Sequence, residues 1–118
     1  MTLKGQGSQD GWAGRRQFRT RVHYWARRVG VKPTRIGIQS MSSKWASCST
    51  KGYVTFSSQL LDMNREFGEY VMIHELLHMK IPNHSKLFKS LMGIHMPDWK
   101  VRVAKMNEDA LARVQADA

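Results

Sequence analysis

The sequence predicts a small α+β domain with an amino-terminal helix, a three-stranded antiparallel sheet and a set of carboxy-terminal helices. Three observations support this fold class: residues 15–29 carry apolar side chains at helical spacing, residues 33–56 hold short runs separated by turn residues, and residues 64–114 return to helical spacing. A chain of 118 residues buries a modest core without disulfides or a second domain. We therefore expect a flexible, glycine-containing tail at residues 1–14 and one domain at residues 15–118.

The first helix is expected from Arg15 to Val29. Its apolar positions are Phe18, Val22, Trp25, Ala26 and Val29. Gly30 follows, and glycine readily adopts the left-handed conformation that commonly closes a helix. Pro33 then begins an extended segment, in which Ile36 and Ile38 alternate with polar neighbours and predict the first strand.

Two further strands are expected on either side of a short turn. Residues 41–48 are predicted as the second strand and residues 53–56 as the third. The four residues between them end in Gly52, which supplies the positive φ that such a turn needs. These connections favour antiparallel neighbours.

The remaining elements are predicted to be helices. Asn64 is expected to cap a helix that runs through the apolar stretch 70–79. Ser85 should begin a short helix that Gly93 ends. From Pro97 onwards a last amphipathic helix is expected to lie across the helix that contains residues 70–79.

The pentapeptide His-Glu-Leu-Leu-His, which begins at His74, is the strongest functional signal in the chain. Residues four apart on a helix lie one turn apart on the same side, so the imidazoles of His74 and His78 can converge on one ion. Glu75 lies beside them. Pro82 ends the helix soon afterwards, and the chain then delivers His84 as a natural third ligand.

Three imidazole nitrogens and one open position are typical of a catalytic zinc site. A structural zinc site is normally closed by a fourth protein ligand, and Cys48, the single cysteine, cannot build a cysteine-rich site. Asp98 and Glu108 are the alternative third ligands, because a downstream acid completes the set in some metallopeptidases. His95 is expected in a solvated loop, with a substrate-facing or transition-state role as the alternative, and His23 on the surface of the first helix.

Such a site would make hydroxide available at neutral pH, because zinc lowers the pKa of a bound water from ~15.7 towards ~7. A carboxylate must accept the water proton and return it to the leaving group, and Glu75 is placed for that role. The alternative is that His74, Glu75 and His78 are ordinary helix residues, but their burial in an apolar stretch would be costly without a purpose. An edge strand beside this helix would hold an extended peptide by main-chain hydrogen bonds.

Several segments together resemble the YgjP-like metallopeptidase family, which is related to the SprT-like and WLM zincins. These segments are Lys44–Cys48, Gly52–Phe56, Tyr70–His78, Asn83–Ser85 with Phe88, and Met96–Trp99. The resemblance covers residues 17–106 and implies a minimal zincin-like domain. It also implies that His74, His78 and His84 are zinc ligands and that Glu75 is the catalytic base.

Two features depart from the family pattern. Ala46 stands where members usually have glycine, and the long amino-terminal β-rich region of typical members is absent from this sequence. The second departure bears on substrate selection, because the absent region would help to shape the cleft.

The net charge of +10 is concentrated in the first half of the chain. Residues 1–61 hold eleven lysines and arginines against one acid, whereas residues 62–118 hold eight of each sign. Eight of the cations fall between Arg15 and Arg35: Arg15, Arg16, Arg19, Arg21, Arg27, Arg28, Lys32 and Arg35. This segment is expected to be a solvated basic face, and binding of nucleic acid or of an acidic protein partner is the alternative.

No run of eighteen apolar residues is present, so no membrane association is expected. The polar start lacks the apolar centre of a secretion signal, and a lone cysteine fits a reducing compartment. The predicted localisation is cytoplasmic. The sequence indicates no oligomeric state.

Three functions are compatible with these observations. The first is a zinc-dependent peptidase, in which activated water attacks a peptide carbonyl and Glu75 carries the proton to the departing amine. The second uses the same site on another bond, such as a nucleotide phosphoanhydride. The third is a basic, nucleic-acid-associated adaptor that retains the metal only to hold its fold.

Overall fold

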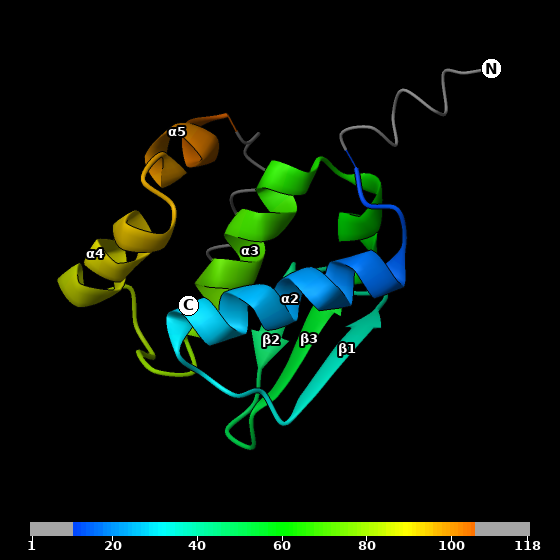
Figure 1. Cartoon of the computed structure of the whole chain (residues 1–118), viewed down its shortest axis with the longest axis horizontal. Coiled ribbons are helices and arrows are strands. Elements are labelled where there is room, and N and C mark those ends of the chain that lie inside the picture. Colours follow the sequence, from blue (N-terminus) through cyan, green and yellow to red (C-terminus); the bar gives the residue numbers. More distant parts are fainter. Residues whose placement is uncertain (1–10, 106–118) are drawn as a thin grey trace.

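The structure, a computed structural model, describes residues 11–105. Figure 1 shows α2 crossing the sheet, with α4 on the side of the molecule opposite β1. The elements in chain order are α2 (Arg15–Val29), β1 (Arg35–Gln39), β2 (Ala46–Cys48), β3 (Tyr53–Ser57), the 3₁₀ helix η1 (Ser58–Asp62), α3 (Arg65–Leu77), α4 (Lys86–His95) and α5 (Trp99–Ala104). The predicted α+β class is confirmed. None of the helices in residues 11–105 is long and apolar enough to cross a membrane.

Helix α2 has the bounds that its apolar spacing predicts. All five predicted core positions, from Phe18 to Val29, are buried. Gly30 adopts a left-handed conformation with φ 86°, and its N–H donates to the carbonyl oxygen of Ala26 at 2.9 Å. Helix periodicity and capping chemistry therefore determine this element locally.

The sheet differs from the prediction in the direction of one strand. The strand order is β1-β3-β2, with β2 antiparallel to β3 but β1 parallel to it, so the prediction of a purely antiparallel sheet is wrong. The physical reason is the position of β1 in the sheet. The short turn between β2 and β3 makes these two strands antiparallel neighbours, and β1 pairs with the opposite edge of β3, where it runs parallel. The second strand is also shorter than predicted, since only residues 46–48 pair.

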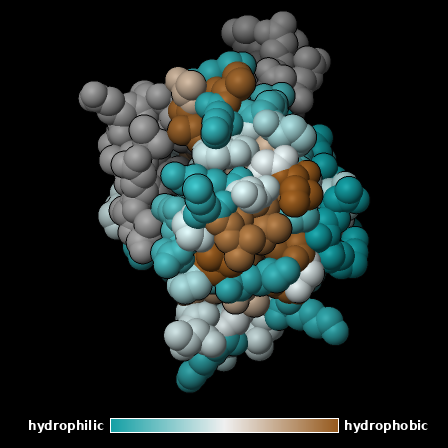
Figure 2. All heavy atoms as spheres, turned by 90° about the vertical axis from the view of Figure 1, so that its left-hand side faces the viewer, coloured by the Kyte–Doolittle hydropathy of each residue, from teal (hydrophilic) through white to brown (hydrophobic). Residues whose placement is uncertain are grey.

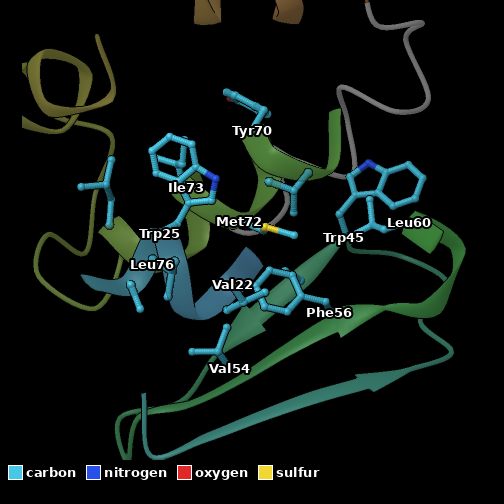
Figure 3. Packing of buried hydrophobic residues seen from close by; sticks show 14 of the residues in the cluster. Val22, Trp25, Trp45, Val54, Phe56, Leu60, Tyr70, Met72, Ile73 and Leu76 are labelled. Carbon is cyan, nitrogen blue, oxygen red and sulfur yellow. The ribbon is translucent and has the colours of Figure 1, made fainter. Parts of the chain in front are cut away.

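The buried core lies where α2, α3 and β3 meet. Figure 3 shows Val22 of α2, Met72 of α3 and Phe56 of β3 pointing toward one another. Phe18 packs edge-on against Phe56, with ring centroids 5.4 Å apart. Among the described residues, the buried polar side chains are Ser57, His74 and Glu75. Two of these three belong to the pentapeptide singled out above.

Trp12 falls within the predicted tail at residues 1–14, but it is part of this core. Its side chain is buried, its ring lies 5.0 Å from that of Phe18, and the guanidinium of Arg65 lies 5.0 Å from its ring. The packed part of the chain therefore begins before the predicted boundary at residue 15. Residues 1–10, where the remainder of the predicted tail falls, lie outside the described residues.

Gly68 on α3 gives Trp12 the space that it occupies. A Cβ at residue 68 would lie 2.7 Å from Trp12 Nε1, so Gly68→Ala is expected to reduce the free energy of unfolding by ~1–3 kcal/mol. The matched control is Gly93→Ala within α4, where the nearest atom to the new Cβ is 3.8 Å away. That change should stabilise the protein by ~0.5–1 kcal/mol, as alanine normally does in a helix. Chemical denaturation measures both, and the Gly68→Ala loss should disappear in a Trp12→Ala background.

The helices that follow the sheet begin at the predicted caps. The side chain of Asn64 accepts a hydrogen bond from the N–H of Phe67, and that of Ser85 accepts one from the N–H of Phe88. Helix α4 does not end at Gly93 as predicted but continues to His95. It ends there because Met96 precedes Pro97, and the helical conformation is disfavoured for a residue before proline. The part of the predicted last helix beyond residue 105 lies outside the described residues.

Helix α4 is amphipathic, but its outer side is not purely polar. Phe88 and Met92 are buried, whereas Leu87 and Ile94 are exposed. Figure 2 shows this side of the molecule, where apolar side chains gather near the centre and hydrophilic side chains surround them. The inner side of α4 packs against α3 and so helps to enclose the site described next.

Candidate metal centre

His74 and Glu75 lie on the last turns of α3 and are almost completely enclosed. Their relative exposures are 4% and 2%. Taking an imidazole and a carboxylate out of water costs several kcal/mol unless polar partners replace the lost hydration. The fold therefore holds these two groups in a place where an ordinary helix would have apolar side chains.

The structure brings the three predicted histidines together. One ring nitrogen from each of His74, His78 and His84 lies within 4.8 Å of the others. The Nε2 atoms of His78 and His84 are 3.1 Å apart. His84 arrives from the loop that follows α3, so the turn between the helix and this loop determines the arrangement.

That turn also orients the ring of His78. The N–H of Ile81 donates to the carbonyl oxygen of Leu77, and Pro82 follows immediately. The Nδ1 atom of His78 lies 3.1 Å from the carbonyl oxygen of Ile81. A carbonyl oxygen only accepts, so Nδ1 carries the proton in this bond and the lone pair of a neutral ring resides on Nε2. Nε2 is the nitrogen that faces His84.

Phe88 of α4 contacts all three imidazoles. Its ring centroid lies 5.2 Å from that of His74, 4.8 Å from that of His78 and 5.0 Å from that of His84. The sequence places Phe88 among the segments that resemble the family but does not predict this contact. The signal that could have found it is its place in the quoted family segments, four residues after His84. Phe88 keeps water from one side of the cluster.

Electrostatics keep His74 neutral. Burial, the largest cause, and then the coulombic interaction with His78 and His84 lower the pKa of His74 to about 3. An unprotonated imidazole retains the lone pair that a metal ion requires. The ring also packs against Tyr70, whose centroid is 5.7 Å away. The His74 ring therefore packs against two aromatic side chains, Tyr70 and Phe88, and against the other two imidazoles.

The alternative ligands do not join this cluster within the described residues. Asp98 accepts a hydrogen bond from Arg102, which lowers the pKa of the Asp98 carboxyl group. Glu108 lies outside the described residues. His95 ends α4 and is half-buried, so the expected solvated loop is wrong, while His23 is exposed on α2 as predicted.

A cavity of about 510 Å³ lies beside Glu75 and His78. One wall comes from residues 44–52, which include β2 and the turn after it, and the other from residues 75–82. Because the strand order is β1-β3-β2, β2 is an edge of the described sheet. The strand that borders the cavity is therefore an edge strand within the part of the chain that the structure describes.

Several cations of the basic segment form bonds within the fold. Arg15 donates to the carbonyl oxygen of Ile38, and Arg19 donates to that of Ile36, so both hold β1 against α2. Arg21 forms an ion pair with Glu69 at 3.1 Å. The exposed members of the segment that make none of these bonds are Arg16, Arg27, Arg28, Lys32 and Arg35. Binding of nucleic acid or an acidic partner here stays a prediction.

The three histidines suit a zinc-sized ion. Two nitrogens bound at ~2.0–2.1 Å to a tetrahedral ion lie roughly 3.3 Å apart. The observed 3.1 Å between the Nε2 atoms of His78 and His84 is close to that distance. An all-nitrogen donor set also disfavours magnesium and calcium, which prefer oxygen ligands. The residues present can therefore hold a transition-metal ion, with Glu75 next to it.

Comparison with solved structures identifies the fold. The metallopeptidase zymogen jannalysin of Methanocaldococcus jannaschii matches with a TM-score of 0.65 at 19% identity, over 75% of this chain and 94% of that one. The metallopeptidase zymogen abylysin of Pyrococcus abyssi matches with a TM-score of 0.61 at 24% identity, over 68% of this chain and 80% of that one. No curated protein matches the sequence.

Comparison with protein families identifies the family of this chain. The family model described as "YgjP-like, metallopeptidase domain" matches residues 13–109, which is most of the chain. The match includes the whole of α3, the loop with His84 and the strand that borders the cavity. Metallopeptidases act through a bound metal ion, and the histidine cluster is where the described residues can hold one. The chain belongs to the YgjP-like family of metallopeptidases.

Proposed function

We propose that this metallopeptidase uses zinc, held by His74, His78 and His84, and that Glu75 is its general base. The observation that carries the proposal is the convergence of three ring nitrogens within 4.8 Å beside an enclosed carboxylate. Nitrogen ligands in this number favour zinc, and three protein ligands leave a position open for chemistry.

When bound, zinc would supply a Lewis acid that polarises the peptide carbonyl and makes a water molecule more acidic. The other steps belong to the side chains of this protein. A carboxylate oxygen of Glu75 accepts the proton of the attacking water and then gives it to the departing amine. Phe88, which contacts all three imidazoles, shields them from solvent. The Nδ1–H of His78, held by the carbonyl oxygen of Ile81, keeps that ring in one orientation.

The edge strand β2 is the proposed binding site for the substrate backbone. It borders the cavity that Glu75 lines, and it is an edge strand of the sheet within residues 11–105. An extended peptide added to this edge would be held by main-chain hydrogen bonds, without strong demands on its side chains. This arrangement favours a peptide over a compact small-molecule substrate.

The two alternative functions have weaker support. Phosphoanhydride hydrolysis commonly uses magnesium held by carboxylates, and the cluster here has three imidazoles. A metal that only stabilises the fold is normally enclosed by a fourth protein ligand. Within residues 11–105 the cluster has three imidazoles, and Glu75 and His78 line a cavity beside it.

Zinc dependence provides the test of the proposed function. Purified protein is treated with a chelator, reloaded with zinc, and assayed on an unstructured casein-derived peptide and on a nucleoside triphosphate. We expect peptide cleavage in the zinc-loaded sample, loss of it after chelation, and no release of phosphate. Phosphate release without peptide cleavage would favour the phosphoanhydride alternative, and neither activity in fully zinc-loaded protein would favour the adaptor.

A further inference from the structure

We propose that Lys80 is a positioning residue of the metal centre, because it holds the turn between α3 and His84 against the carboxyl end of α2. This inference rests on the proposed function, since it concerns the same three histidines. The ammonium of Lys80 donates to the carbonyl oxygen of Val29 at 2.9 Å. The two residues are 51 positions apart in the sequence, so the bond joins two distant segments of the chain.

The carboxyl end of α2 is a suitable acceptor for this ammonium. The last carbonyl groups of a helix lack partners from a following turn, and they form the negative end of the helix dipole. The residue four positions after Val29 is Pro33, which has no N–H to donate. Figure 1 shows this end of α2 beside the carboxyl end of α3. Lys80 therefore supplies the donor that the helix itself cannot provide.

Helix α2 is a firm support for Lys80, because other bonds tie it to α3. One carboxylate oxygen of Glu69 on α3 accepts a hydrogen bond from Arg21 at 3.1 Å and another from Trp25 at 3.0 Å. Both donors belong to α2, and the side chain of Glu69 is 16% exposed. Helix α2 cannot shift along α3 without breaking these bonds. The bond from Lys80 to Val29 therefore holds the turn after α3 in a defined place.

The turn that contains Lys80 also orients a histidine of the cluster. The N–H groups of Lys80 and Ile81 both donate to the carbonyl oxygen of Leu77, at 2.9 and 2.8 Å. The carbonyl oxygen of Ile81 then accepts from Nδ1 of His78 at 3.1 Å. Because a planar peptide unit joins Lys80 to Ile81, a displacement of Lys80 moves the Ile81 carbonyl with it. His84 follows three residues later, so its place depends on the same turn.

The sign of the effect distinguishes positioning from a direct effect of charge. The ammonium of Lys80 repels a divalent cation held by the histidines, so charge alone predicts that its removal leaves zinc affinity unchanged or increases it. Loss of the bond to Val29 instead loosens the turn, and the ring of His78 must then be ordered when zinc binds. Positioning therefore predicts weaker zinc binding, which the loss of a nearby cation does not explain.

The test is the zinc affinity of the purified chain, measured by competition with a chelator at about pH 8, where free imidazoles are neutral. Lys80→Met keeps an unbranched apolar stem but removes the donor. We expect its dissociation constant for zinc to rise about three- to tenfold, a smaller effect than that of removing a group bonded directly to a ligand. Lys80→Arg, which restores a donor, should return the constant to within about twofold of the parent value.

Lys89→Met is the matched control, because it removes the same group from an exposed position on α4. Its zinc affinity should equal that of the parent. A second measurement follows the imidazole N–H of His78 by NMR in the zinc-free protein. This hydrogen should exchange with water faster in Lys80→Met than in the parent or the control, because the Ile81 carbonyl no longer holds it as firmly.

The outcomes separate this inference from the function on which it rests. Zinc affinity in Lys80→Met equal to or above that of the parent overturns the positioning role and leaves the zinc site intact. An equal loss of affinity in Lys89→Met or in Lys80→Arg, or unchanged exchange of the His78 N–H in Lys80→Met, overturns it as well. A parent protein that binds no zinc overturns the proposed function itself.

Discussion

Replacing Glu75 with glutamine is expected to reduce peptide turnover by about a hundredfold to ten-thousandfold while leaving the zinc content unchanged. Glutamine has nearly the same shape as glutamate, so it fits a site with 2% exposure, but its amide cannot accept the water proton. The measurement is kcat on one peptide for parent and variant, with zinc quantified in the same samples.

Glu66→Gln is the matched control for this prediction, because it changes the same chemical group on the same helix. The side chain of Glu66 is 72% exposed and lies 3.7 Å from Arg102, so its ion pair contributes little to stability. This variant should retain parental turnover. Parental turnover in a Glu75→Gln variant that is folded and zinc-loaded would remove Glu75 from the proposed mechanism.

The features that the sequence predicted well are those set by neighbouring residues. The bounds of α2, the caps at Asn64 and Ser85, and the positive φ of Gly52 all follow from local spacing or local hydrogen bonding. The meeting of the histidines is also largely local, because His74 and His78 share one helix and His84 follows after a short turn. A proline-terminated helix limits where the next residues can go.

The features that the sequence did not predict depend on contacts between distant segments. The parallel pairing of β1 with β3 requires knowledge of which strand occupies the centre of the sheet, and no local pattern provides it. Trp12 follows a glycine-containing segment, and its burial depends on the space left by Gly68, far along the chain. Phe88 likewise resembles any apolar residue of an amphipathic helix until α4 packs against the end of α3.

His74→Ala is expected to abolish zinc binding, lowering the zinc content from near one ion per chain to near none. His74 is buried most deeply of the three histidines, so no solvent-exposed side chain can easily replace its nitrogen. The variant also loses packing against Tyr70 and Phe88. Metal analysis after dialysis measures the ion content, with His23→Ala, which removes an exposed imidazole from α2, as the control.

Thermal unfolding separates loss of the ion from loss of packing. Zinc that binds the folded state alone stabilises it by about 4 kcal/mol at a thousandfold excess over the dissociation constant. The melting temperature of the parent should therefore fall on chelation, whereas that of His74→Ala should be low already and should not respond to the chelator. A variant that kept both its zinc and its chelator response would show that the ion is held elsewhere. In that case the short distances among the three imidazoles would reflect packing alone, and the proposed role of Glu75 would lose its physical basis.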